Sequence, residues 1–559
     1  MTQAEKEVEN GKEKEKDRDK EKEKEQQRGV KRPIAPAAIA EPLQEQIQSN
    51  FVIVIHPGSR TVRIGRATDT VPITIPHVIA RRHKQSGQPR YEDTWLLREG
   101  LNKPESNEQR QNGLKMVDQA IWSKKMSNGM RRTPVSAEQA RAYNCQIRPA
   151  VLDSSSRVKW TNTSHHPAYL VGDEAVYVNP SDCYNVHWPV VRGQLNVHSG
   201  SGGSLTAVLA DLETIWSHVI QKHLDIPLKD LKYYRCILLV PDIYNRQHIK
   251  EMVSMLLLNM GFSAIIVHQE SVCATFGSGL SSACVVDVGD QKTSVCCVED
   301  GVSHRNSRLC LAYGGSDVTR TFFWHLQRAG FPYRDCQLTS RLDCQLLQHL
   351  KENVCHLNQV KTAIISQFES KALGLDKAIL HSIDCCASDE TKRKMYSSIL
   401  VVGGGLMFHG AQEFLLHRII NKMPPSFRRL VDNVEVITRP KDMDPRLISW
   451  KGGAVLACLD TTQEMWIHQR EWQRFGVRML RERAAFVWNY QKGIKKLSIT
   501  VAADEEGLQH CDVCSQKTDT AFTFLILLHP WVEVLDLQDD LFFPSAFCHQ
   551  EDLEGLCHH

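Results

Sequence analysis

Hydrophobic residues become regular along this chain only near residue 51. The run 51–55 is apolar and β-branched, residues 56–59 (His-Pro-Gly-Ser) interrupt it, and 61–65 resumes it. Two such runs separated by a short segment with proline and glycine are typical of a β-hairpin. We therefore predict that the ordered body begins with a hairpin.

Strand and helix patterns alternate further along. Apolar positions recur with helical spacing in 205–224 and 247–260, whereas 237–240 and 264–268 are short continuous apolar runs. Alternation of this kind predicts βαβ units in an α/β layer fold. The pattern returns in the second half with a helix at 317–327, a buried strand at 399–402 and a helix at 412–420.

Three segments lack such patterns. Residues 1–45 begin with a dense mixture of Lys and Glu and very few apolar side chains, which predicts a disordered tail. Residues 84–165 are rich in Asn, Gln, Ser and basic residues, and we predict a long, partly ordered insertion there. No stretch reaches the roughly 18 to 20 apolar residues of a membrane span, so we expect a soluble protein without membrane contact.

The net charge of +3 is unevenly distributed over the 559 residues. Residues 489–559 have 4 basic against 12 acidic residues, whereas 29–488 have 55 basic against 43 acidic. A basic body permits a polyanionic partner such as DNA. The 18 cysteines are scattered, several in apolar runs, which indicates buried thiols in a reducing compartment.

The segment around Asp287, Gly289 and Asp290 carries the most informative chemistry. A glycine turn after an apolar strand lets backbone N–H groups approach a phosphate, and the two carboxylates are suited to hold Mg²⁺ through water. An ordinary β-hairpin, whose turn also favours Asp and Gly, explains the same residues. This segment alone does not distinguish a phosphate-binding turn from an ordinary hairpin.

Several strings together resemble the actin superfamily. The turns at 56–59 and 287–290 and the glycines 403–405 follow one another in that family's order, and 169–175, Lys351-Glu352 and 450–454 agree with them. The resemblance covers 46–488 and implies an actin-like (ribonuclease H-like) two-lobed ATPase fold with a nucleotide cleft. Strings at 244–248, 268–274 and 475–488 resemble, within the superfamily, nuclear actin-related subunits of chromatin-remodelling complexes.

The resemblance implies a site for ATP or ADP with Mg²⁺. The residues that it assigns to nucleotide binding are Ser59, Arg60, Asp287, Val288, Gly289, Asp290, Lys351, Glu352, Gly403, Gly404 and Gly405. Asp287 and Asp290 are also the expected metal-side carboxylates. Without the family pattern, Lys351 and Glu352 would read as an exposed charge pair on a helix.

Four departures from the family pattern predict weak hydrolysis. His56 stands where the family has an aspartate, and Arg63 replaces its phosphate-touching lysine. Glu270, or Gln269 after a one-residue slip, stands where the family has a water-positioning glutamine, and Ser294 replaces the histidine that assists it. Because phosphoryl transfer depends on positioning water, we expect ATP binding with little turnover. The alternative is a catalytically active ATPase or kinase of the actin, chaperone and sugar-kinase superfold.

The resemblance also implies the biological setting. It predicts a chromosome-associated nuclear protein that mounts on a remodelling motor subunit beside other actin-like subunits, contacts nucleosomal DNA and histones, and supports transcription regulation, DNA repair and recombination. The insertion 84–165 replaces a filament-contact loop, so we expect a monomer or dimer when free. Family strands are missing near 359–366. Residues 489–559 form a tail unlike the family, and its irregular Cys/His spacing does not predict zinc.

Overall fold

The computed structural model describes residues 48–83, 91–96, 137–146, 159–355, 374–429, 431 and 433–484. All of them belong to one compact unit that begins at Gln48. The predicted tails at 1–45 and 489–559 and the predicted deletion near 359–366 lie outside the described residues. Of the insertion 84–165, only 91–96, 137–146 and 159–165 are described.

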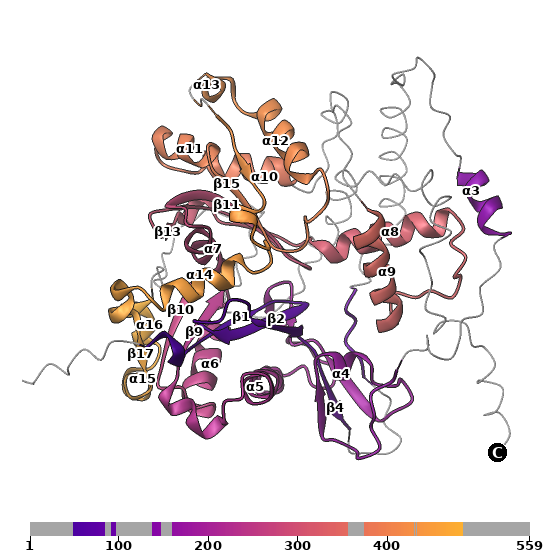
Figure 1. The fold of residues 1–559 in the computed structure, drawn as a ribbon, viewed down its shortest axis with the longest axis horizontal. Helices are drawn as coiled ribbons and strands as arrows, with labels where there is room; N and C mark the ends of the chain where they lie inside the picture. Colours follow the sequence, from indigo (N-terminus) through magenta and orange to yellow (C-terminus); the bar gives the residue numbers. More distant parts are fainter. Residues whose placement is uncertain are drawn as a thin grey trace, which may run out of the picture. The chain divides into compact units, whose positions relative to one another are not determined.

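The first sheet has six strands in the order β17-β10-β9-β1-β2-β3 (Figure 1). The strands are β1 (Val52–Pro57), β2 (Thr61–Arg66), β3 (Ile73–Pro76), β9 (Arg235–Val240), β10 (Ala264–Gln269) and β17 (Ile467–His468). β1 pairs antiparallel with β2 and parallel with β9, which pairs parallel with β10. The predicted hairpin and both βαβ strands are confirmed, although His56 and Pro57 extend β1 instead of ending it.

The second sheet repeats this order. Its path is β13-β12-β11-β15-β16, with β14 beside β12. The strands are β11 (Ser282–Val288), β12 (Thr293–Glu299), β13 (Val302–Ser303), β14 (Leu309–Leu311), β15 (Ile399–Val402) and β16 (Val436–Ile437). β11 forms a hairpin with β12 and lies parallel to β15, which lies parallel to β16. The β1–β2 and β11–β12 turns therefore occupy equivalent places in the two sheets.

Helices between the strands bury apolar faces against the sheets. The longer ones are α5 (Leu205–Lys222), α6 (Arg246–Ser254), α7 (Glu270–Ser278), α8 (Gly315–Arg328), α9 (Arg341–Val354), α10 (Leu375–Asp384), α11 (Asp389–Tyr396), α12 (Ala411–Lys422) and α14 (Ile448–Leu456). Shorter α-helices are α3 (Ala137–Asn144), α4 (Asp173–Val176), α13 (Pro425–Arg428), α15 (Gln469–Phe475) and α16 (Arg478–Arg483). The predicted α/β class is confirmed.

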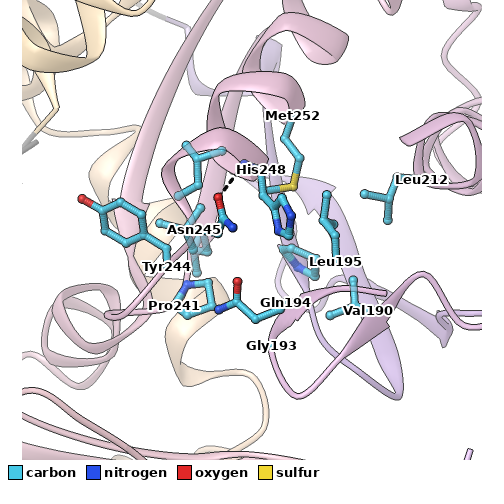
Figure 2. Close-up of a pocket in the computed structure, with 14 residues that line it drawn as sticks. Val190, Gly193, Gln194, Leu195, Leu212, Pro241, Tyr244, Asn245, His248 and Met252 are labelled. Atoms are coloured by element: carbon cyan, nitrogen blue, oxygen red, sulfur yellow. Dashed lines mark hydrogen bonds between the residues drawn. The ribbon is translucent and has the colours of Figure 1, made fainter. Parts of the chain in front are cut away.

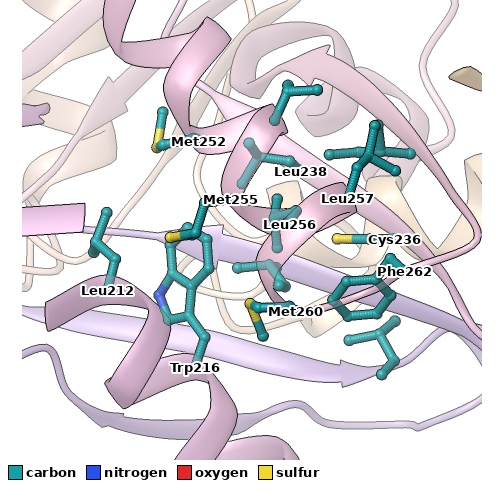
Figure 3. Packing of buried hydrophobic residues seen from close by; sticks show 14 of the residues in the cluster. Leu212, Trp216, Cys236, Leu238, Met252, Met255, Leu256, Leu257, Met260 and Phe262 are labelled. Atoms are coloured by element: carbon teal, nitrogen blue, oxygen red, sulfur yellow. The ribbon is translucent and has the colours of Figure 1, made fainter. Parts of the chain in front are cut away.

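Each large sheet has its own hydrophobic core. In the first, one buried cluster contains Trp216 of α5, Met255 and Leu256 of the π-helix η4 (Met255–Asn259), and Phe262, and Trp216 lies beside Met255 (Figure 3). The second core gathers side chains of β11, β12, β15, α10 and α12. Two buried cores on equivalent sheets explain why apolar periodicity appears twice along the sequence.

Helices α7 and α14 cross in close contact because glycines remove the side chains between them. A Cβ on Gly452 would lie 1.6 Å from the carbonyl oxygen of Cys273, and one on Gly277 would lie 2.1 Å from that of Ile448. The neighbouring Trp450 Nε1–H donates to the carbonyl of Val54 in β1 at 3.1 Å. Residues 450–454 (Trp-Lys-Gly-Gly-Ala) thus hold α14 against α7 and against the first sheet.

Smaller elements complete the described part. A three-stranded sheet contains β4 (Ile79–Arg82), β5 (Tyr169–Val171) and β6 (Tyr184–His187), and a short hairpin contains β7 (Val190–Val191) and β8 (Gln194–Leu195). The 3₁₀ segments are η1 (Ser49–Phe51), η3 (Leu228–Tyr233), η5 (Arg305–Ser307), η7 (Pro440–Asp442) and η8 (Asp460–Met465). Among the described helices, none has both the length and the apolar character needed to cross a membrane.

Candidate functional site

The first turn of the site joins β1 to β2. Gly58 N–H donates to the carbonyl of Thr61 at 3.0 Å, and a Cβ on Gly58 would lie 2.7 Å from that same oxygen. The carbonyl of Gly58 accepts a hydrogen bond from His77 Nδ1 at 2.8 Å. Burial lowers the pKa of His77 to about 4, so a neutral ring supports the turn from behind. The turn is therefore rigid and closely packed.

Side chains around this turn are held by distant segments. Ser59 is buried, and its Oγ accepts from the backbone N–H of Gly193 at 3.3 Å. The guanidinium of Arg60 lies 4.5 Å from the ring centroid of Trp95, in cation–π contact. His56 and Arg63 are directly opposite one another in the β1–β2 register, so their side chains share one face of the hairpin.

The second turn joins β11 to β12 and packs against the glycine turn after β15. Gly289 N–H donates to the carbonyl of Lys292 at 2.9 Å, and Gly405 N–H donates to that of Val288 at 2.7 Å. Gly403 has φ +86°, and a Cβ there would lie 2.4 Å from the Val288 oxygen. A Cβ on Gly405 would lie 2.5 Å from the Gly289 oxygen. These glycines are required for the two turns to approach each other.

Trp95, from the insertion, connects the two turns. Its ring lies against Arg60 of the first turn, and its Nε1–H donates to Asp290 Oδ2 of the second at 3.1 Å. Its carbonyl accepts from Gln291 Nε2 at 3.2 Å, and its ring stacks on Trp188 with centroids 5.8 Å apart. Sequence reasoning missed Trp95, because a lone tryptophan in a polar insertion carries no local signal of this contact.

A buried ion pair lies at the centre of the site. Lys292 Nζ is 2.5 Å from Glu270 Oε2, and the two side chains are only 11% and 4% exposed. The other carboxylate oxygen, Glu270 Oε1, is 3.5 Å from His56 Nε2. Glu270 begins α7, which follows directly on β10, whereas Lys292 follows the second turn. The pair thus links residues from both sheets.

The charges in this cluster perturb one another. Burial by itself would raise the pKa of Glu270, but Lys292 and His56 together lower it to about 2. Burial would likewise lower the pKa of Lys292, but the charges of Glu270 and Asp287 raise it above its ordinary value. Burial and the nearby Glu270 charge raise the pKa of Asp287. At neutral pH the Glu270–Lys292 pair is therefore fully ionised.

The structure distinguishes the two candidates for the water-positioning place. Gln269 is buried away from the turns, where its Oε1 accepts from Ser303 Oγ at 2.6 Å and its Nε2 donates to the carbonyl of Asp242 at 3.2 Å. Only Glu270 contacts His56 and Lys292. Sequence reasoning identified Glu270 but did not foresee its pairing with Lys292, since 22 residues separate the two.

Three polar atoms of the hairpins are buried without a hydrogen-bond partner among the described residues. They are His56 Nδ1, Arg63 Nε and Ser294 Oγ. Ser294 is directly opposite Asp287 in the β11–β12 register, as Arg63 is opposite His56 in the first hairpin. Buried polar groups are normally satisfied, so these atoms indicate where a polar ligand would complete the site.

Lys351 and Glu352 differ in their surroundings. Lys351 on α9 is buried, and its Nζ donates to the carbonyl of Gly315 at 2.9 Å and to Gln348 Oε1 at 2.7 Å. Burial lowers the pKa of Lys351 to about 8, although the charge of Asp290 opposes this. Glu352 is exposed and accepts from Gln348 Nε2. An exposed charge pair, the interpretation without the family pattern, is therefore wrong for Lys351.

The donors present fit a nucleotide. Two glycine turns, the unpaired donors of Arg63 and Ser294, and the cation of Lys351 suit an anionic ligand. The predicted Mg²⁺ site, formed by Asp287 and Asp290, fits a cation less well. Asp290 already accepts from Trp95, and Lys292 places a positive charge near Asp287, where it lowers the carboxyl pKa against the effect of burial. Like charges repel, so a dication is disfavoured beside this ammonium.

A separate pocket lies behind the first turn (Figure 2). Its walls are mainly apolar and come from Val190, Leu195, Leu212, Leu239, Ile249 and Met252. Pro57 and Gly193 line it as well, so it shares backbone with the first turn. Asn245 caps α6 at its rim by accepting from Gln247 N at 2.9 Å. Because its lining has no charged side chain, this pocket does not suit phosphate.

The chain is similar in sequence to known proteins. The model of the actin family matches residues 47–341 and 350–485. Actin-related protein 8 of Salmo salar is 66% identical, over 79% of this chain and 93% of that protein. The Bos taurus protein of the same name is 62% identical, over 87% of this chain and 100% of that protein.

A solved structure is also similar. The structure described as human actin-related protein Arp8 in its ATP-bound state is 72% identical, with a TM-score of 0.75, over 82% of this chain and 100% of that chain. The Salmo salar alignment spans 587 positions, more than the 559 residues of the present chain, so that relative contains segments that this chain lacks.

Proposed function

The chain belongs to the actin family, and from this premise we propose that it is a nuclear actin-related subunit of a chromatin-remodelling complex that holds ATP or ADP with little hydrolysis. The main role is structural: the nucleotide stabilises the body, and the body serves partner contacts. The human relative in its ATP-bound state supports the nucleotide part of the proposal.

The Glu270–Lys292 pair carries the proposal of weak hydrolysis. Phosphoryl transfer requires a water molecule positioned in line with the terminal phosphate. The carboxylate of Glu270 already accepts from Lys292 at 2.5 Å and lies 3.5 Å from His56, so it is engaged in the protein's own ion pair. Ser294, at the second water-positioning place, offers a hydroxyl where a base would be needed.

Two measurements on the purified full-length chain test whether it holds nucleotide with little hydrolysis. Nucleotide released by denaturation is identified by chromatography, and turnover of added ATP is followed beside conventional actin. We expect bound ATP or ADP and turnover slower than that of actin. Turnover at the rate of actin that is abolished by Asp287→Ala would instead support the alternative of an active ATPase. Lys250→Met, which removes only a surface pair with Glu251, is the matched control.

Proposed partners are a remodelling motor subunit, other actin-like subunits, nucleosomal DNA and histones. The surplus of basic residues in 29–488 supports contact with the phosphate backbone of DNA, which is independent of base sequence and falls steeply with salt. The chain is tagged and purified from nuclear extract, and the subunits that co-purify are identified. Recovery without chromatin proteins, or DNA binding that does not change between low and physiological salt, would count against this part.

A further inference from the structure

The carboxylates of the nucleotide site are already balanced by basic side chains of the chain. Glu270 pairs with Lys292 at 2.5 Å, and the charges of Lys292 and Arg63 act on Asp287. Asp290 interacts electrostatically with the buried ammonium of Lys351 and accepts a hydrogen bond from Trp95. Each of the three acidic groups therefore has a cation nearby. The site is close to neutral before any ligand binds.

The position of Lys292 is fixed by packing. Its side chain is 11% exposed. A Cβ on Gly193 would lie 2.7 Å from its Cδ and 2.9 Å from its Cε, so the aliphatic stem lies directly against the β7–β8 hairpin. The ammonium is consequently held where it meets Glu270. Lys292 also directly precedes Thr293, which pairs in the β11–β12 register with Val288, the residue after Asp287.

We infer that the ammonium of Lys292 takes the electrostatic role of a divalent cation in this site, so that the chain binds ATP or ADP without requiring Mg²⁺. This rests on the proposed function, because it concerns the same nucleotide site. Lys292 is here a specificity-determining residue and takes no part in bond making.

The physical reason is charge balance. A polyphosphate entering a site lined by unpaired carboxylates needs a dication between the like charges. In this chain Lys292 already neutralises Glu270, and the unpaired Arg63 Nε and the Ser294 hydroxyl are available to meet phosphate oxygens. A dication entering beside Asp287 would meet the ammonium instead. Mg²⁺ therefore adds little to binding.

The test compares ATP binding by the nucleotide-stripped full-length chain with excess Mg²⁺ and with excess EDTA, by isothermal titration calorimetry. We expect Kd values within about threefold of each other, which is less than 1 kcal/mol of binding free energy. A loss of about tenfold or more in EDTA overturns the inference. Absence of binding in both media would instead refute the nucleotide-holding function, so the two failures are distinguishable.

Two substitutions assign the effect to the ammonium. Lys292→Met keeps the length of the stem but leaves Glu270 without its cation, so we expect ATP affinity in EDTA to fall about tenfold or more and Mg²⁺ to restore part of it. Lys292→Arg keeps the charge, so its ATP affinity should be the same with Mg²⁺ and with EDTA. Equal affinities of Lys292→Met in both media, with a native circular dichroism spectrum, would overturn the assignment. If Lys292→Met does not fold, the inference is tested by the Kd values of the wild-type chain and of Lys292→Arg in the two media. A loss of about tenfold or more in EDTA for either of them would overturn it.

Discussion

The buried pair of Glu270 and Lys292 makes a stability prediction that does not involve nucleotide. We consider Lys292→Met and Glu270→Gln, which remove one charge each and nearly preserve shape, together with the double variant. Removing one partner leaves the other charge buried, whereas removing both leaves none. The single substitutions should therefore destabilise strongly, and the double variant should be no worse than either single one.

The structure sets the size of the effect. A buried charge left without its partner costs about 3–5 kcal/mol. Here each residual charge keeps a weaker neighbour, since Glu270 remains 3.5 Å from His56 and Lys292 remains near Asp287. We therefore expect about 2–3 kcal/mol for each single variant and less than this for the double variant, and so a coupling of at least about 2–3 kcal/mol.

Differential scanning calorimetry of the nucleotide-free chain measures this cycle. A loss of 1 kcal/mol lowers Tm by roughly 2–4 °C in a domain of 150–250 residues and by less in a larger one, so we expect a decrease of several degrees. The pKa of Glu270 is lowered to about 2 from its ordinary 4.5, so its contribution is complete above about pH 4.5 and disappears as the pH falls towards 2. Additive effects of the two substitutions at neutral pH would show that the two charges do not stabilise each other and would refute the reasoning.

Three further predictions concern the turns around the pair. Gly403→Ala places a Cβ 2.4 Å from the Val288 oxygen at φ +86° and should cost about 2–4 kcal/mol by calorimetry, whereas Gly404→Ala, with 3.4 Å to its nearest neighbour, should change stability little. Because burial lowers the pKa of Lys351 to about 8, its ammonium is lost above that pH, and ATP affinity from titrations should fall there; a Lys351→Met variant that keeps the same pH dependence would contradict this. Trp95→Ala removes the contacts with Arg60 and Asp290 and should weaken ATP binding about tenfold, whereas unchanged affinity would show that this bridge does not order the site.

Local patterns predicted much of the fold. The hairpin of β1 and β2, strands β9 and β10, and helices α5, α8 and α12 agree with the predicted segments within a few residues. Each of these elements has its own apolar period, which depends only on which side chains must face a core. Observed element boundaries differ from the predicted ones where strand pairing extends an element. Strand β1, for example, continues through His56 and Pro57.

The candidate site was predicted only in part. Sequence order and the family pattern pointed to the glycine turns, to Asp287 and to Lys351, which lie together in the structure as neighbours of the same turns. Lys292 and Trp95 were missed. Neither belongs to a motif with a fixed spacing, and each acts through a partner that lies far along the chain.

The sequence by itself determined the elements, the two glycine turns and the identities of the departures at His56, Glu270 and Ser294, because these are properties of single residues and short periods. Only the tertiary structure decided what the departures do. It brought Lys292 within 2.5 Å of Glu270 and buried both, and the low exposure of the pair is what makes its charges effective. Pairing across 22 residues and two sheets depends on the packing of whole elements. No local pattern contains that information.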